Sequence, residues 1–165
     1  MRRILAIAVL LLAGCQDEPT PEEKAAEDER AIAMVEAAND AKPPLELVTP
    51  DPILLPDIER FDLYGTGCNY APGTSLGTRV IAREADAFMK IGGEVVRLAA
   101  DPGSRELPMH SRSLYSGKDY ALRLEIHNDG EPANGGSVNY EGTVTVRDAW
   151  GRVVYEGTGL AQCRS

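Results

Sequence analysis

Histidine, cysteine and tryptophan are scarce in this sequence, whose 165 residues include two histidines, three cysteines and one tryptophan. His110 and His127 form neither an H-x-H nor an H-E-x-x-H pattern, and no second cysteine or histidine lies at a ligand spacing from Cys68 or Cys163. Because zinc sites need such clusters, no metal site is expected. No cofactor is expected either, since Gly65-Thr66-Gly67 stops short of a dinucleotide-binding fingerprint.

Basic residues are also few, with 17 lysines and arginines against 26 aspartates and glutamates and a net charge of −9. Binding to phosphates needs a basic face, so nucleic acid is not an expected partner. The same charge argues against electrostatic adhesion of the chain to anionic lipid. An acidic surface is compatible with a basic protein partner.

The sequence has one long apolar run, Ile4 to Leu12, and it is too short to span a bilayer. The run follows Arg2 and Arg3 and ends in small residues, which is typical of a secretory signal peptide over residues 1–14. Leu12-Ala13-Gly14-Cys15 resembles the lipobox of bacterial lipoproteins, in which the cysteine is lipidated and becomes the mature N-terminus. The resemblance implies export, and attachment to a membrane through acyl chains on Cys15.

The residue after the lipobox bears on which membrane receives the protein. In enteric bacteria, an aspartate directly after the lipidated cysteine retains a lipoprotein in the inner membrane. Gln16 occupies that position here. The resemblance therefore favours the outer membrane, with the chain facing the periplasm.

Assigning Cys15 to lipid leaves Cys68 and Cys163, in a chain expected to reach an oxidising compartment. We predict a disulfide between them, which ties the start of the folded part to its end. It closes a loop of about 95 residues. On the chain-entropy model it stabilises the fold by on the order of 4 kcal/mol.

Residues 15–42 read as an acidic tether and residues 43–57 as a proline-rich linker. Pro21 to Lys42 is rich in Ala, Glu and Lys, and Thr20 can cap a helix that begins at Pro21. Its apolar stripe is narrow, so the segment is either a solvated helix or a partly ordered tether. Five prolines between Pro43 and Pro56 exclude a helix or a central strand there. The apolar residues of this linker predict that part of it lies against the following domain.

From Ile58 to Ser165 the pattern favours β-structure. Tyr120, Leu122, Leu124 and Ile126 alternate with more polar residues, as in a half-buried strand. A second alternating strand runs from Val138 to Arg147, where Gly142 suggests a bulge or a tight bend. Gly92-Gly93 is a two-residue hairpin signal. These signals predict a small antiparallel β-barrel or sandwich of about seven or eight strands.

The sequence contains no enzyme motif in the structural context that its chemistry needs, and no catalytic residue is assigned. Gly73-Thr74-Ser75-Leu76-Gly77 matches G-x-S-x-G, but a strand follows the serine where the nucleophile elbow needs a helix. The carboxylate pairs Asp57 with Glu59 and Glu84 with Asp86 read as exposed charges of an acidic protein.

Ser116-Gly117-Lys118-Asp119-Tyr120 fits S-G-x-x-Y, a signature of the bacterial inhibitors of c-type lysozyme. A lipobox followed by a small β-barrel with one disulfide also resembles the membrane-bound branch of that family. In those inhibitors the serine-bearing loop enters the lysozyme cleft. The resemblance therefore implies that Ser116, Gly117, Lys118 and Tyr120 contact the partner. The family's second motif, a tyrosine followed by Thr-Lys-Gly, is absent here, and a plain turn that leads into the strand at Tyr120 explains the same residues.

We therefore expect a non-catalytic, monomeric envelope lipoprotein that is anchored by lipid and acts as a binding module. A c-type lysozyme is the most specific candidate for its partner. The alternative is an accessory of a larger envelope complex that docks through its tether and apolar linker.

Overall fold

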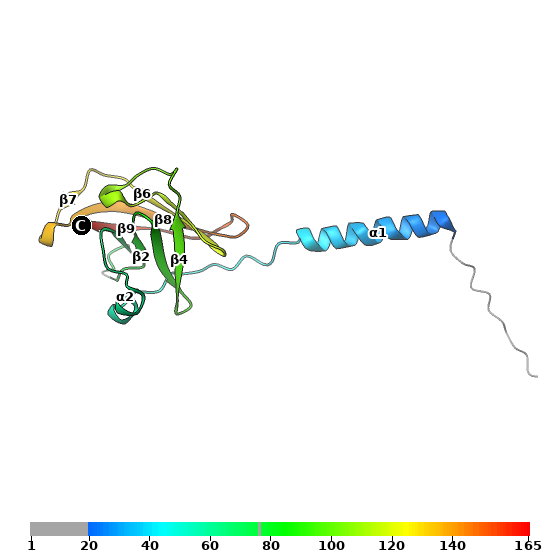
Figure 1. The fold of residues 1–165 in the computed structure, drawn as a ribbon, viewed down its shortest axis with the longest axis horizontal. Coiled ribbons are helices and arrows are strands. Elements are labelled where there is room, and N and C mark those ends of the chain that lie inside the picture. The colour runs from blue at the N-terminus through cyan, green and yellow to red at the C-terminus, as the bar shows by residue number, and fades with distance from the viewer. Residues whose placement is uncertain (1–19, 76) are drawn as a thin grey trace, which may run out of the picture. The chain divides into compact units, whose positions relative to one another are not determined.

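The structure, a computed structural model, describes residues 20–75 and 77–165 (Figure 1). The chain divides into two compact units, Met1–Pro43 and Pro44–Ser165. Cys15, the predicted lipidation site, lies outside the described residues. Within the described residues, no helix is both long enough and apolar enough to cross a bilayer.

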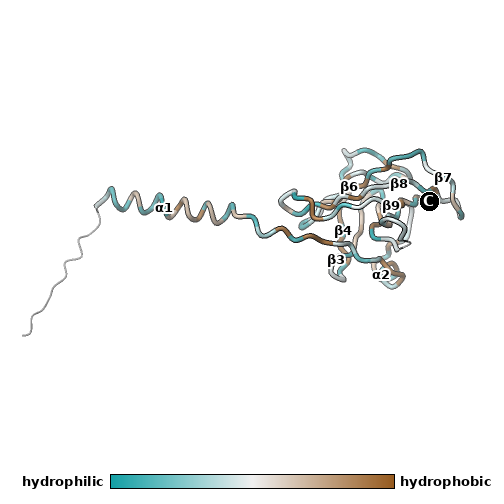
Figure 2. The backbone as a smooth tube through the Cα atoms, turned by 180° about the vertical axis from the view of Figure 1, so that it is seen from behind, coloured by the Kyte–Doolittle hydropathy of each residue, from teal (hydrophilic) through white to brown (hydrophobic). Residues whose placement is uncertain are grey.

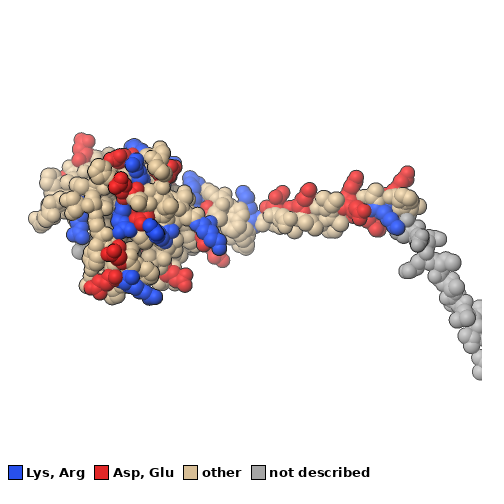
Figure 3. Space-filling model, viewed as in Figure 1, with Lys and Arg blue, Asp and Glu red and all other residues tan. Residues whose placement is uncertain are grey.

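The first unit contains one described helix, α1 (Pro21–Asp40). Thr20 and Glu23 form a capping box, in which the Glu23 N–H donates to Thr20 Oγ1 at 3.3 Å and the Thr20 N–H donates to Glu23 Oε2 at 2.8 Å. These bonds satisfy backbone donors that a helix start leaves open. No residue within α1 is buried, and acidic side chains follow its length (Figure 3). The helix is therefore a solvated rod.

The second unit is built from nine strands and a short helix among its described residues. The strands are β1 (Gly67–Pro72), β2 (Val80–Ala82), β3 (Asp86–Ile91), β4 (Glu94–Ala100), β5 (Leu114–Ser116), β6 (Tyr120–Ile126), β7 (Glu131–Pro132), β8 (Val138–Asp148) and β9 (Val153–Arg164). The helix is α2 (Leu55–Phe61), and single 3-10 turns lie at Pro108–His110 and Asn134–Gly136.

Eight of these strands close into an antiparallel barrel. Each strand from β1 to β5 pairs with the next along the chain, β6 pairs with β8, β8 with β9, and β9 with β1. The short β7 pairs with the start of β8, beyond the end of β6. The fold is thus a barrel and not a sandwich, and closure leaves few strand edges open to other chains.

Buried side chains fill the inside of the barrel. The alternation predicted for β6 is confirmed, because Leu122 and Leu124 are buried and Tyr120 and Ile126 pack against the same core. The largest fully buried side chains include Tyr70, Tyr115, Met89, Leu98, Val80, Val144 and Val146. Burial of apolar surface on this scale is the main stabilising contribution to the fold.

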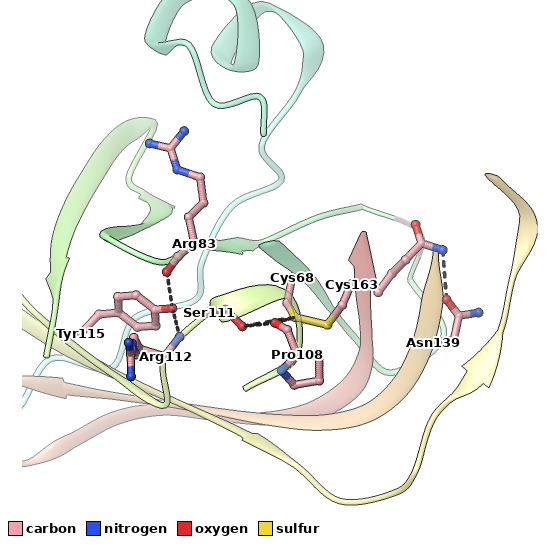
Figure 4. Close-up of a disulfide and its surroundings, with 9 residues drawn as sticks. Cys68, Arg83, Pro108, Ser111, Arg112, Tyr115, Asn139 and Cys163 are labelled. Carbon is pink, nitrogen blue, oxygen red and sulfur yellow. Dashed lines mark hydrogen bonds between the residues drawn. A yellow bond between two sulfur atoms is a disulfide. The ribbon is translucent and has the colours of Figure 1, made fainter. Parts of the chain in front are cut away.

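The Tyr115 hydroxyl joins the segment before β5 to the end of β2 inside the barrel. It donates to the carbonyl oxygen of Arg83 at 2.8 Å and accepts the N–H of Arg112 at 2.6 Å (Figure 4). Burial raises the pKa of this phenol to about 12, although the Arg112 bond opposes the shift. The hydroxyl thus satisfies two backbone groups that the sheet leaves without a partner.

The predicted disulfide between Cys68 and Cys163 is confirmed. The two residues lie directly opposite each other in the β1–β9 pairing, and both are fully buried. The segment before β5 covers the bond: the Ser111 hydroxyl lies 2.8 Å from the carbonyl oxygen of Pro108 and 3.4 Å from Cys68 Sγ (Figure 4).

The proline-rich segment packs on the barrel and continues into α2. The N–H groups of Val48, Asp51 and Ile53 donate to the carbonyl oxygens of Val154, Lys90 and Thr78, respectively. Ile53 and Leu63 form a second apolar cluster with Ile81 and Phe88 on the outer side of the sheet. Figure 2 shows the apolar residues of this segment in brown where the chain reaches the barrel.

Two details of the sequence prediction are wrong. A helix, α2, begins at Leu55 inside the segment from which prolines excluded one, because Pro56 falls in its first turn, where its missing N–H costs nothing. The bulge considered at Gly142 is absent, because Gly142 pairs regularly with Gly159, and the register shift of β8 lies at Val146 and Arg147.

Candidate partner-binding site

Tight turns gather at one end of the barrel, which we call the hairpin rim. They are the β3–β4 turn at Gly92–Gly93, the β5–β6 turn at Gly117–Asp119 and the β8–β9 turn at Ala149–Arg152. Because β3, β5 and β8 run in the same direction round the closed sheet, their following turns meet at the same end. The Gly92-Gly93 hairpin is as predicted, with positive φ at both glycines.

The S-G-x-x-Y residues form the β5–β6 turn. The Gly117 N–H donates to the Tyr120 carbonyl oxygen at 2.8 Å, so that Lys118 and Asp119 make a two-residue loop. Ser116, Gly117, Lys118 and Asp119 are exposed, whereas Tyr120 packs against the core. The motif is thus a short, exposed turn that its tyrosine anchors to the barrel, and not a long finger.

The β8–β9 turn lies beside this motif, because Tyr120 pairs with Asp148. It presents Trp150, the one tryptophan of the chain, with 49% of its surface exposed. The sequence analysis did not identify Trp150 as a candidate. A signal was present, since this large aromatic residue stands in a turn and not at an inward position of a strand.

Asp148 holds the Trp150 turn in place. Its Oδ1 accepts the N–H groups of Trp150 and Arg152 at 2.9 Å each, and its Oδ2 accepts the Arg152 Nε–H at 2.6 Å. The Arg152 guanidinium lies over the Trp150 ring, 5.2 Å from its centroid. Desolvation would raise the pKa of the Asp148 carboxyl, but the bonds from Arg152 and Trp150 prevail and lower it. The turn is therefore pre-organised through an ionised carboxylate.

Two arginines lie on the outer wall below the motif, although the chain as a whole is acidic. A hollow of about 130 Å³ lies next to Ser116, and its lining includes Arg123 of β6 and Arg147 of β8 together with one acidic residue, Asp101. Lys118 adds a third cation at the turn above it. Donors of this kind suit carboxylates, which guanidinium and ammonium groups bind through charge-assisted hydrogen bonds.

Most of the other residues singled out in the sequence have structural roles. Desolvation would raise the pKa of Asp86, but its bonds to Arg83 and Arg97 lower it. The Leu54 N–H and then the Lys90 ammonium likewise lower the pKa of Asp57. In the described part of the chain, no group of His, Cys, Asp and Glu side chains could hold a metal ion.

Ser75 and the two histidines lie apart from the hairpin motif. Ser75 sits in the connection between β1 and β2, where its hydroxyl accepts the Gly77 N–H at 3.1 Å. His110 contacts Glu106 at 2.8 Å, and His127 contacts Thr143 at 2.8 Å. None of these hydrogen bonds involves the Ser116 turn.

Acid is expected to loosen the Trp150 turn. Since the folded Asp148 pKa lies below the usual value of about 4, its stabilising effect is present above that pH and is lost as pH falls through the folded pKa. Fluorescence anisotropy of the one tryptophan measures this directly. We expect it to fall below about pH 4 in the native chain. An Asp148→Asn variant should show low anisotropy already at pH 7 and no acid step, and an unchanged step in that variant would contradict the assignment.

Comparison of the chain with protein families, with curated proteins and with solved structures found no match. Its function is therefore inferred from its own residues.

Proposed function

We propose that this chain is a non-catalytic, lipid-anchored envelope lipoprotein whose barrel binds a c-type lysozyme through the hairpin rim and inhibits it. The observation that carries this proposal is the exposed Ser116–Asp119 turn, which Tyr120 anchors to a closed barrel. Cys15 provides the lipid attachment, and the chain functions as a monomer on the periplasmic side of the outer membrane.

Binding on the outside of the barrel fits the filled interior. Tyr70, Tyr115 and Met89 are fully buried within the barrel core and occupy space that a ligand inside it would need. The closed sheet fixes the base of each turn. A partner that binds the rim therefore meets a surface that is already ordered, which lowers the entropic cost of association.

The charges near the turn suit the cleft of a lysozyme. Glycoside hydrolysis there depends on two carboxyl groups that flank the scissile bond. The Ser116 hydroxyl and the Lys118 ammonium are exposed donors on one short turn, and Arg123 and Arg147 lie on the wall beneath them. An inserted turn can hydrogen-bond the catalytic carboxyl groups and exclude the substrate. The net charge of −9 suits the basic surface of the enzyme outside its cleft.

Lysis of cell-wall suspensions by a c-type lysozyme tests this proposal. The chain from Gln16 to Ser165, which contains every described residue, is expected to inhibit lysis in proportion to its concentration. Lys118→Glu places a carboxylate against those of the cleft and should raise the half-inhibiting concentration at least about tenfold. Arg105→Glu is the matched control, because Arg105 is an exposed cation on the β4–β5 connection at the opposite end of the barrel. Undiminished lysis at large molar excess of the native chain would refute the proposal.

A second candidate function is that of an assembly accessory that docks through the tether. What favours it is the exposure of Ile32, Met34 and Val35 on α1, which no contact within that helix covers. Deletion of residues 21–42, with Cys15 retained, leaves the barrel and its packed linker intact. On this second proposal the deletion abolishes co-purification with other envelope proteins, and retained partners would exclude it.

A further inference from the structure

Apolar side chains continue the hairpin rim beyond the Ser116 turn. Trp150 is 49% exposed and Val153, at the start of β9, is 38% exposed. Leu45 and Leu47, in the segment that leads into the barrel, are 51% and 76% exposed. We call these four residues the apolar ridge. Burying exposed apolar side chains is favourable, and groups of them on one part of a surface mark sites of association.

Backbone pairing places the linker part of the ridge next to β9. The Val48 N–H donates to the Val154 carbonyl oxygen at 3.0 Å. Leu47 directly precedes Val48 in the chain, and Val153 directly precedes Val154. Val48 and Val154 pack into the barrel core. Their neighbours along the chain, Leu47 and Val153, are left on the outer side, where they are exposed.

The aromatic part of the ridge is held rigidly. Asp148 bonds both Trp150 and Arg152, and the Arg147 guanidinium donates to the Gly151 carbonyl oxygen at 2.8 Å. These bonds fix the backbone of the turn, while the Trp150 side chain itself stays half-exposed. An aromatic side chain on a fixed turn binds with little loss of conformational entropy, which is a property of interface hot spots.

We infer that the apolar ridge is a second contact area for the same lysozyme-type partner, with Trp150 as its anchor and Leu47 as a linker contribution. This inference rests on the proposed function of the hairpin rim. A protein occupant is favoured over a lipid surface because charges of both signs border the ridge: Glu46 lies between its two leucines, Lys118 and Asp119 share the adjacent turn, and Arg152 lies over Trp150. A protein surface can present matching charges of both signs, whereas anionic headgroups would attract the cations and repel the carboxylates.

The ridge also makes the segment before the barrel part of the binding surface. A domain cut at Ile58, where the alternating strands begin in the sequence, would lack Leu45 and Leu47. The ridge predicts that such a trimmed chain binds the partner less tightly than one that retains the linker.

The test measures the affinity of the chain from Gln16 to Ser165 for c-type lysozyme by calorimetry. Trp150→Ala is expected to raise Kd at least about thirtyfold, as for an interface hot spot, and Leu47→Ala about fivefold. Phe61→Ala is a closely matched control and should leave Kd unchanged. Phe61 is an aromatic residue of α2, 42% exposed, and the Arg60 guanidinium lies 5.2 Å from its ring centroid, as Arg152 does from Trp150. Near-ultraviolet circular dichroism verifies that each variant remains folded.

The outcomes separate the inference from the function on which it rests. If the native chain neither binds nor inhibits lysozyme, the proposed function fails. If the native chain binds and Trp150→Ala binds equally well, the ridge inference alone fails. Vesicles of phosphatidylethanolamine and phosphatidylglycerol test for a lipid contact. If the native chain binds them, and Trp150→Ala abolishes that binding while the affinity for lysozyme is unchanged, the inference is overturned in favour of a lipid contact.

Discussion

Replacing Cys68 and Cys163 together by alanine is expected to lower the free energy of unfolding by about 4 kcal/mol. The two residues are 95 positions apart, so the disulfide restricts nearly the whole barrel sequence in the unfolded chain. Few single features of a domain of this size contribute as much, because total stabilities are only about 5–15 kcal/mol. Thermal unfolding followed by circular dichroism should show a fall in Tm of roughly 15 °C.

Reduction provides the control for this prediction. Dithiothreitol under unfolding conditions should destabilise the native chain to a similar extent and leave the double-alanine variant unaffected. Alanine is preferable to serine because both positions are fully buried, and a serine hydroxyl would need a hydrogen-bond partner there. Equal Tm values for the native and double-alanine chains would contradict the prediction.

Gly159→Ala is expected to destabilise the barrel by about 3 kcal/mol, the upper end for overpacking a closed interior. A Cβ at this position would collide with the carbonyl oxygen of Ala71 and would lie 2.6 Å from the Gly73 nitrogen and 2.7 Å from the Pro72 Cα. All of these are backbone atoms of the β1 end, so no side-chain rotation relieves the contact. Urea unfolding of the variant measures the loss.

Gly103→Ala is the matched control for this substitution. Gly103 lies in the exposed β4–β5 connection, where a Cβ would meet the Asp101 Oδ1 at 3.3 Å. The free energy of unfolding of the Gly103→Ala variant should differ from that of the native chain by less than about 0.5 kcal/mol. A Gly159→Ala variant as stable as Gly103→Ala would show that β1 and β9 do not approach as closely as described.

Local patterns predicted the parts of the barrel in which side chains alternate cleanly. Tyr120 to Ile126 and Val138 to Arg147 each have apolar residues at every second position, and Gly92-Gly93 needs positive φ at both positions. The disulfide followed from a count of cysteines. These features depend on neighbours in the sequence, so they could be recognised without the fold.

Other parts depend on contacts that no local pattern reveals. β9 contains Gly157 and Gly159, which weaken its pattern, yet a Cβ at Gly159 would collide with the backbone of β1 and one at Gly157 with the side chains of Tyr155 and Tyr70. α2 is seven residues long and is stabilised by Asp57, which bonds the Leu54 N–H and Lys90 of β3. Closure through the β6–β8 pairing distinguishes a barrel from a sandwich, and it joins strands across the β7 connection.

Only the Ser116 turn of the candidate site could be predicted from the sequence. The Ser116 turn carries a recognisable motif, but Trp150 becomes its neighbour through the pairing of Tyr120 with Asp148. Leu47 joins them through the Val48–Val154 hydrogen bond. Both pairings connect segments that are distant along the chain, so the composite surface could not be read from the sequence.

The way in which the linker is attached has a mechanical consequence. Any tension along the N-terminal segment reaches the barrel first at Val48, and then at Asp51 and Ile53, whose bonds go to β9, β3 and the connection before β2. These bonds must break one after another before the tension arrives at β1. There the covalent link between Cys68 and Cys163 prevents β1 from peeling away from β9. A protein pulled by one end in this way would yield at its linker long before its sheet opened.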